Sequence, residues 1–234
     1  MENTSFFSHL FFNINVLQIT PSIITTWFIM LVLAGIAWVS TRKLSVTPKT
    51  PQVILETIII MMQNAITDVL PEQAELIFPF IATLWIFILI ANLIGVVPGF
   101  YSPTADLSVT SSLAILTFFS THWFGIRAEG LKNYLLHYLR PSPLLLPFHL
   151  ISEISRTLAL AVRLFGNVMS LQFAALLVLM IAGFLVPVPL LMLHIIEAII
   201  QAYIFGILAL IYIAGGIQLQ AERRENQLRK EERK

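Results

Sequence analysis

The chain has 234 residues, of which 57% are hydrophobic and only 12% are charged, and its formal net charge is +1. A mean hydropathy of +0.85 lies far outside the range of soluble globular domains and indicates a membrane protein with several spans. The near-neutral charge gives no support to nucleic-acid binding through a basic surface, and the absence of cysteine excludes disulfides, thiolate metal sites and cysteine nucleophiles.

Five runs are long and apolar enough to cross a membrane as helices. A bilayer core is about 30 Å thick and needs roughly 20 apolar residues in a helix. Runs of this kind predict spans over residues 23–39, 76–97, 107–126, 144–186 and 189–219. The N-terminal sequence MENTSFFSHL does not have the basic, apolar and small-residue order of a cleaved signal, so we expect the first span to be retained.

The segment between the first two spans has a different pattern. Residues 52–70 are apolar overall, but Glu56, Gln63 and Thr67 recur at helical spacing. One polar face on an apolar helix is typical of a helix that lies in the membrane interface. We therefore predict an interfacial amphipathic helix here.

The last two tracts are longer than a bilayer requires. A helix of about 40 residues is about 60 Å long, roughly twice the thickness of the hydrocarbon core. The sequence VPVP between them predicts a turn, because proline cannot continue a helix. We expect two long, tilted helices that form a hairpin, so that residues 1–219 make a single membrane domain and residues 220–234 a charged cytoplasmic tail.

The distribution of lysine and arginine predicts the orientation. All of them except Arg156 and Arg163 fall within residues 42–49, residues 127–140 or the C-terminal tail. Five crossings place these three segments on the same side of the membrane. Because basic loops stay in the cytoplasm, the N-terminus is expected outside and the C-terminus inside.

Polar residues form a stripe along the fourth tract. Steps of three or four residues connect seven positions, six of them polar: His149, Glu153, Arg156, Leu160, Arg163, Asn167 and Ser170. A charged group at the bilayer centre costs on the order of 3 kcal/mol, so this stripe must face protein or water rather than lipid. The final tract has a similar seam, made of His194, Glu197, Gln201 and Leu208.

The predicted orientation gives the polar residues a depth. Glu153 lies toward the cytoplasm, whereas Gln172, His194 and Glu197 lie toward the exterior. Arg163 is between these groups, and neither group alone crosses the membrane. The sequence therefore predicts two separate polar regions on either side of an arginine.

Some of these residues also have purely structural interpretations, which the sequence leaves open. Glu153 and Arg156 are three residues apart and could form an ion pair at the membrane surface. His194 could be an ordinary packed histidine, and Asp106 is also placed to cap the helix that follows it. Arg163 has no acidic neighbour at helical spacing on its own helix, so its counter-ion must come from another helix or chain.

Four motifs identify a family. The chain resembles subunit a of rotary F-type ATP synthases from about residue 20 to residue 219, through RLFGN (163–167), QAYIF (201–205), NLIGVVP (92–98) and PTADLSVT (103–110). The resemblance implies an all-α integral membrane subunit whose last two helices lie beside the ring of c subunits. It implies further partners in the b subunits of the peripheral stalk and in membrane lipid, a place in the bacterial inner membrane, no cofactor or metal and no catalysis by this chain alone.

The resemblance also implies roles for single residues. Arg163 looks like the stator arginine that faces the ion-carrying carboxylate of each c subunit, so that H⁺ or Na⁺ must use two half-channels and the ring between them. Gln201 and Asn167 look like the amide residues beside that arginine. His194 matches a position in the exterior half-channel, and Arg156 a basic position on the cytoplasmic approach.

Gln172 departs from the family pattern. Many members have a glutamate nine residues after the arginine, and here that carboxyl is missing. Glu197 is one helical turn from both His194 and Gln201, and we predict that it replaces the missing carboxyl. The sequence around Arg163 also resembles that of the N-type branch of the family, for which sodium is the expected transported ion.

Other function classes fit the sequence less well. A secondary transporter, the main alternative, predicts an internal repeat, but the first half has no counterpart of the Arg163 stripe. An intramembrane hydrolase would need a motif such as HExxH or GxSxG, and neither is present. A simple channel for cations is disfavoured because Arg163 would repel them.

Overall fold

The computed structural model describes residues 13–14, 17–18, 20–42, 50–97, 100–130, 146–182, 186 and 188–231. Almost all of these residues are helical, which confirms the predicted all-α membrane fold. The strands within the described residues are β1 (Asn13–Ile14) and β2 (Leu17–Gln18), which pair antiparallel with Asn13 opposite Gln18.

The helices follow the predicted spans closely. In chain order they are α1 (Pro21–Arg42), α2 (Thr50–Val69), α3 (Ala74–Leu93), α4 (Leu107–Glu129), α6 (Leu146–Ala182) and α7 (Val188–Glu231), with the short 3-10 turns η1 (Ile94–Val96) and η2 (Pro103–Ala105) between α3 and α4. Within the described ranges, five helices are long and apolar enough to cross a membrane, all of these except α2. The helix α2 coincides with the predicted amphipathic segment. Residues 144–145 of the fourth predicted span, and residues 183–185 and 187 around the predicted turn, lie outside the described residues.

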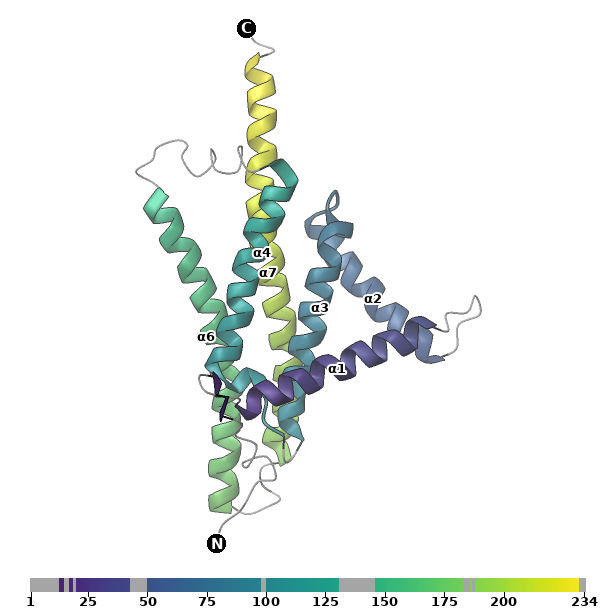
Figure 1. Cartoon of the computed structure of the whole chain (residues 1–234), viewed down its shortest axis with the longest axis vertical. Helices are drawn as coiled ribbons and strands as arrows, with labels where there is room; N and C mark the ends of the chain where they lie inside the picture. Colours follow the sequence, from purple (N-terminus) through teal and green to yellow (C-terminus); the bar gives the residue numbers. More distant parts are fainter. Residues whose placement is uncertain are drawn as a thin grey trace.

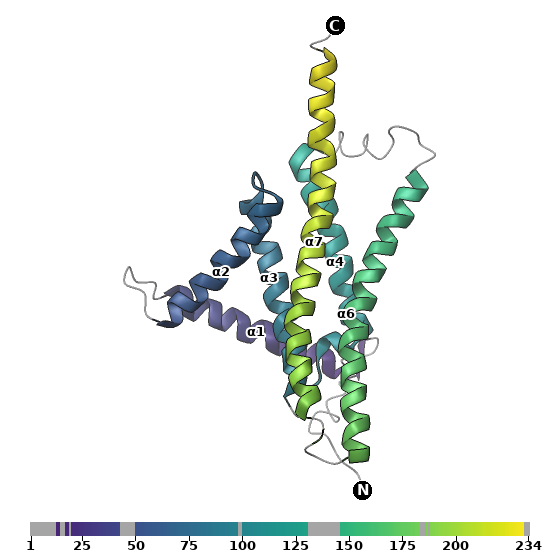
Figure 2. The same ribbon diagram turned by 180° about the vertical axis from the view of Figure 1, so that it is seen from behind.

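The two long helices run antiparallel. Figures 1 and 2 show α6 descending to the end of the molecule at which α7 begins, with α4 beside them and α3 on the other side of α7. The helix α1 is steeply inclined to the others (Figure 1). We call the end where α6 finishes and α7 starts the hairpin end, and the opposite end of these helices the far end.

The core lies where α3 crosses α7. Isoleucines of α3 and alanines of α7 are fully or almost fully buried there, among them Ile77, Ile81, Ile88, Ala202 and Ala209. The Trp85 indole of α3 lies against the α7 backbone at Gly206, where a Cβ atom would overlap it. The Trp85 ring stacks on Tyr203 with centroids 5.9 Å apart, and its Nε1–H donates to the Tyr203 carbonyl at 3.2 Å. This glycine therefore fixes the position of α3 on α7.

The helix α7 continues beyond its apolar part. It has 44 residues and runs without a break to Glu231, whereas its apolar, span-length section ends at Ile217. The backbone of the charged tail is therefore helical as far as Glu231. At 1.5 Å per residue, the section after Ile217 extends α7 by about 20 Å.

Candidate functional site

A hydrogen bond joins the polar seams of the two long helices. Asn167 Nδ2 on α6 donates to Gln201 Oε1 on α7 at 2.8 Å. Gln201 is only 2% exposed, and its Nε2 is a buried donor that has no partner within the described part of the chain. A buried, unpaired amide costs about 1–3 kcal/mol, so a polar group from outside the described residues would stabilise this site.

Arg163 lies one turn before Asn167 on α6. Its side chain is exposed, and no hydrogen bond or ion pair to it is found among residues 20–42, 50–97, 100–130, 146–182 and 188–217. Large apolar side chains are exposed near the same level of both helices, including Leu158, Val162, Ile199 and Ile200. An uncompensated cation on such a surface needs an anion from another chain, because lipid cannot supply one in the membrane interior.

Several polar side chains converge on Gly95 at the hairpin end. A Cβ atom at Gly95 would lie 2.9 Å from Ser102 Cβ, 3.0 Å from Gln172 Nε2 and 3.7 Å from His194 Nε2. His194 is 5% exposed, and its Nε2 lies 3.2 Å from the Asn92 carbonyl oxygen. The structure thus brings together Gln172 of α6 and His194 of α7, which the sequence placed at a similar depth.

A hydrogen-bonded chain of side chains extends this group into the loop before α4. Thr104 Oγ1 donates to Asn92 Oδ1 at 2.6 Å, the Thr104 and Ser102 hydroxyls are 2.8 Å apart, and Ser102 Oγ donates to the Ala91 carbonyl at 2.8 Å. We call Asn92, Gly95, Ser102, Thr104, Gln172 and His194 the hairpin-end cluster. Sequence reasoning quoted the motifs that contain Asn92 and Thr104 but gave these two residues no role, and it did not consider Ser102.

A cavity of about 400 Å³ opens beside this cluster. It lies between α6 and the loop before α4, and its lining includes Ser22, Ser102, Asp106, Phe165, Met169 and Gln172. The polar side chains of this lining come from α1, from the loop before α4 and from Gln172 of α6. The cavity therefore leads from an acidic residue at the start of α4 to the side chain of Gln172.

Asp106 caps the helix α4, which confirms the capping role that its position before this helix indicated. Its Oδ1 accepts hydrogen bonds from the backbone N–H and the hydroxyl of Ser108, at 2.9 and 2.8 Å. Partial burial raises the pKa of this carboxyl, but the hydrogen bonds from Ser108 and from the Ser22 hydroxyl outweigh it, so the pKa lies below its ordinary value. Asp106 therefore places a stable negative charge on the cavity wall.

Glu197 is half-buried on α7, one turn after His194 and one turn before Gln201. It lies within electrostatic reach of His194. It is not among the residues that line the large cavity. The structure therefore places Glu197 between the hairpin-end cluster and the hydrogen bond of Asn167 with Gln201.

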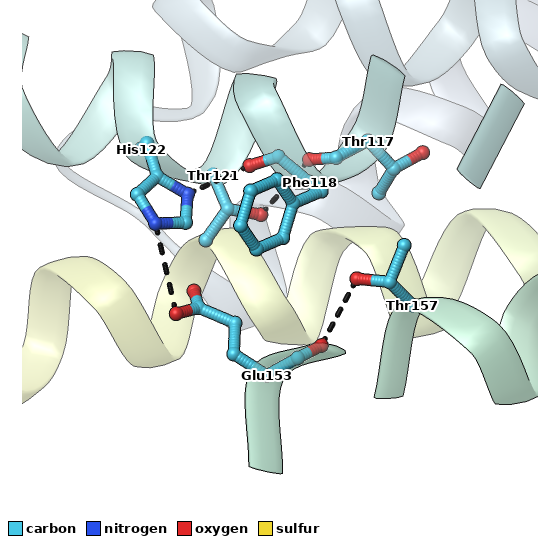
Figure 3. A network of polar contacts seen from close by, with 6 residues as sticks. All are labelled: Thr117, Phe118, Thr121, His122, Glu153 and Thr157. Carbon is cyan, nitrogen blue, oxygen red and sulfur yellow. Dashed lines mark hydrogen bonds and ion pairs between the residues drawn. The ribbon is translucent and has the colours of Figure 1, made fainter. Parts of the chain in front are cut away.

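A second polar group lies toward the far end, between α4, α6 and α7. Glu153 Oε2 is 3.6 Å from His122 Nε2, and Figure 3 shows the two side chains pointing toward each other. The Arg156 guanidinium lies over the Tyr212 ring at 5.8 Å from its centroid. We call these four residues the far-end cluster; three of them, all but His122, line a small cavity of about 40 Å³. The side chain of His149, which the polar stripe included, lies outside the described residues.

Sequence reasoning missed His122. It placed Glu153 next to Arg156 on one helix, whereas the structure gives Glu153 an ion pair with a residue of α4. A signal was present, because His122 is the only ionisable residue in the predicted span 107–126. An ionisable residue within a span is a functional candidate by default.

The two cavities do not meet along α6. On α6, Phe165 is the residue of the large cavity that lies nearest the far end, and Leu160 is the residue of the small cavity that lies nearest the hairpin end. Between them, Leu164 is fully buried, Leu160 itself is only 2% exposed, and Arg163 faces outward. The two cavities therefore share no lining residue.

Comparisons with known proteins show what the chain is similar to. A family model described as ATP synthase A chain matches residues 23–214. ATP synthase subunit a of Legionella pneumophila strain Philadelphia 1 is 70% identical over 219 residues, which cover 93% of this chain and 95% of the relative. ATP synthase subunit a 2 of Pelobacter propionicus is 58% identical over 213 residues, covering 91% of this chain and 93% of the relative.

A third relative, ATP synthase subunit a 1 of Hahella chejuensis, is 55% identical over 210 residues, which cover 90% of this chain and 89% of the relative. These matches extend over all the spans of the chain. Together with the five long apolar helices, they indicate a multi-pass protein of the bacterial inner membrane. The chain therefore belongs to the ATP synthase A chain family, as a non-catalytic subunit a of the membrane-embedded stator.

Proposed function

We propose that this chain provides two half-channels, through which H⁺ or Na⁺ reaches and leaves the rotating c-ring, and that Arg163 separates them. The observation that supports this proposal is that the two cavities beside α6 are separated by a stretch of this helix with buried leucine and the exposed Arg163. An ion that enters one cavity must then move onto a carrier in another chain before it can leave by the other.

The exterior half-channel is the cavity beside the hairpin-end cluster. Asp106 attracts cations to its wall, and Gln172 and His194 lead toward Gln201 and Asn167 at the level of Arg163. Oxygen and nitrogen atoms of this kind can replace the water around a small cation. Glu197 supplies the carboxyl that Gln172 does not.

The cytoplasmic half-channel passes the far-end cluster. Glu153 and Arg156 line the same small cavity there, with Arg156 held against Tyr212. The opposite charges of Glu153 and Arg156 give this approach a defined local potential. Arg156 would therefore shape the potential on the cytoplasmic side, and Glu153 would take part in releasing or accepting the ion.

Arg163 acts on the c-ring. A fixed cation stabilises the ionised carboxylate of a c subunit, and each pKa unit of such stabilisation is about 1.4 kcal/mol. It also repels free cations, so it opposes direct leakage between the half-channels. Each charge that moves through 100 mV supplies about 2.3 kcal/mol, and the ring sums several such steps into torque.

The remaining partners follow from the family and the orientation. The N-terminus would lie outside and the C-terminus in the cytoplasm, with residues 1–219 as the membrane domain and residues 220–234 as the tail. At 37 residues, α6 is about 55 Å long and must tilt to stay within a bilayer core of about 30 Å. The b subunits of the peripheral stalk would hold the chain while the ring turns.

The transported ion is decided by the c subunit, whose residues bind it. The resemblance of the Arg163 region to the N-type branch favours Na⁺. A c-subunit sequence with hydroxyl or glutamine ligands beside its carboxylate would support sodium, and a lone carboxylate in an apolar setting would support protons instead.

The experiment that tests this function uses the assembled complex in inverted membrane vesicles. We expect Arg163→Ala to abolish ATP-driven ion pumping, while the soluble head still hydrolyses ATP. Arg127→Ala is the matched control, because Arg127 is an exposed arginine in the last turn of α4, outside both cavities. Pumping by Arg163→Ala at the level of Arg127→Ala would contradict the proposal.

A further inference from the structure

We propose that His122 is a positioning residue of the cytoplasmic half-channel. It holds a proton beside Glu153, so that ion passage at this end follows the protonation state of the pair. The inference rests on the proposed function and deepens it, because the motifs of the chain and the names of its relatives give His122 no role. It is carried by the geometry of α4 against α6.

The His122 ring has a fixed orientation. Its Nδ1 lies 2.9 Å from the Phe118 carbonyl oxygen, and its centroid lies 4.4 Å from that of the Phe118 ring. Because a carbonyl oxygen only accepts hydrogen bonds, Nδ1 must carry a hydrogen. The other nitrogen, Nε2, then points across to Glu153 on α6 (Figure 3).

The proton on Nε2 decides the charge of the pair. When Nε2 carries a proton, an imidazolium cation faces the Glu153 carboxylate. When Nε2 has lost its proton, its lone pair faces the carboxylate oxygens, so that two hydrogen-bond acceptors oppose each other. The contact is therefore attractive when Nε2 carries its proton. Transfer of that proton from Nε2 to Oε2 leaves a neutral imidazole and a neutral carboxylic acid, so no further reactant is needed.

The pair is not in direct hydrogen-bond contact. The distance of 3.6 Å from Nε2 to Oε2 suits an ion pair but is too long for a good hydrogen bond. The small cavity that Glu153 lines has a volume of about 40 Å³ and polar walls, which is room for a water molecule. The side chains of His122 and Glu153 are 25% and 20% exposed, so both are accessible to an ion or to water.

Among the side chains that the structure describes, the neighbours of the pair in the small cavity have contacts of their own. The hydroxyls of Thr117, Thr121 and Thr157 each donate to a carbonyl of their own helix, at 2.9 to 3.0 Å. The Arg156 guanidinium of α6 lies over the Tyr212 ring of α7. Within this described group, the proton therefore changes the charge of His122 and Glu153, and Glu153 attracts a cation most strongly when His122 is neutral.

The test is passive ion conduction through vesicles stripped of the soluble head, with the pH of the cytoplasmic face varied between about 5 and 8, where histidine changes charge. We expect His122→Gln to remove the pH-dependent step of the wild type and to hold conduction near its high-pH level at every pH, because Glu153 then faces no imidazolium. His122→Lys should hold conduction at the low-pH level throughout. Thr157→Val, a matched change on the same cavity wall without a titratable group, should keep the shape of the wild-type profile.

The inference is overturned if His122→Gln lowers conduction by the same factor at every pH, because a packing defect would do that. If the His122 variants do not assemble into membranes, Glu153→Gln tests the pair from α6 and must remove the same pH-dependent step; a retained step overturns the inference. Arg163→Ala separates the two proposals. If Arg163→Ala abolishes pumping while His122→Gln keeps the wild-type pH profile, the proposal of two half-channels is supported and the proposed role of His122 is wrong.

Discussion

At the residue scale, the chain concentrates its polar side chains at two places on α6 and α7. The sequence predicted which residues share the face of each helix, because that follows from spacing along one chain. It could not predict that Gln172 and His194 meet at Gly95, or that Glu153 pairs with His122. Those contacts depend on which helices become neighbours, and helical spacing contains no information about a second helix.

Glu197 provides a direct test of the missing carboxyl at residue 172. We expect Glu197→Gln to reduce ATP-driven ion transport sharply, because the exterior half-channel then has no carboxyl between His194 and Gln201. Adding Gln172→Glu should restore transport, since residue 172 lies beside His194 near Gly95. Gln172→Glu alone serves as the control. Unchanged transport in Glu197→Gln would show that this carboxyl is not needed.

Asp106 combines two roles that substitutions can separate. Asp106→Ala removes the cap of α4 and should cost about 1 kcal/mol of stability, whereas Asp106→Asn keeps a capping side chain and should cost less. Thermal unfolding in detergent measures both.

The lowered pKa of Asp106 adds a pH dependence with a definite sign. Since the folded pKa lies below the ordinary value of about 3.9, the carboxylate stabilises the fold above that value and stops doing so as the pH falls through the folded pKa. The stability gap between wild type and Asp106→Ala should therefore narrow in acid. A gap that widens as the pH falls would contradict the structure.

At the element scale, the predicted boundaries of the helices lie within a few residues of those in the structure, except at the C-terminal end of α7, which continues to Glu231. The reason is physical: an apolar run of defined length, ended by proline, glycine or charge, leaves a membrane helix few alternatives. The packing of α3 on α7 was not predictable, because a glycine in an apolar run gives no sign of the residue that will approach it. Only the structure shows Trp85 over Gly206.

The packing of α3 on α7 predicts the effect of adding a single methyl group at Gly206. Gly206→Ala would place a Cβ atom within the Trp85 indole and should destabilise the subunit by about 1–3 kcal/mol, as other overpacked cores are. Gly215→Ala, on the same helix, is the matched control because its Cβ would meet nothing within 4 Å. The amount of folded subunit a in membranes measures both. Equal amounts in the two variants would show that α3 does not pack on Gly206 as described.

At the scale of the whole molecule, two cavities open toward opposite ends of one helix pair, and a buried segment with an outward arginine lies between them. The family could be recognised from four short motifs, and the comparisons confirm it. The separation of the cavities could not be derived from those motifs, because it depends on buried leucines such as Leu164, which in the sequence look like any other apolar residue of a span.

The absence of cysteine permits the measurement that tests this separation most directly. Single cysteines are placed at Gln172 in the large cavity, at Thr157 in the small cavity and at Leu164 between them, and each is treated with a membrane-impermeant thiol reagent from either side. Two half-channels predict labelling of residue 172 from the exterior only, of residue 157 from the cytoplasm only, and of residue 164 from neither side. Labelling of residue 164 from both sides, or of residues 172 and 157 from the same side, would contradict the account.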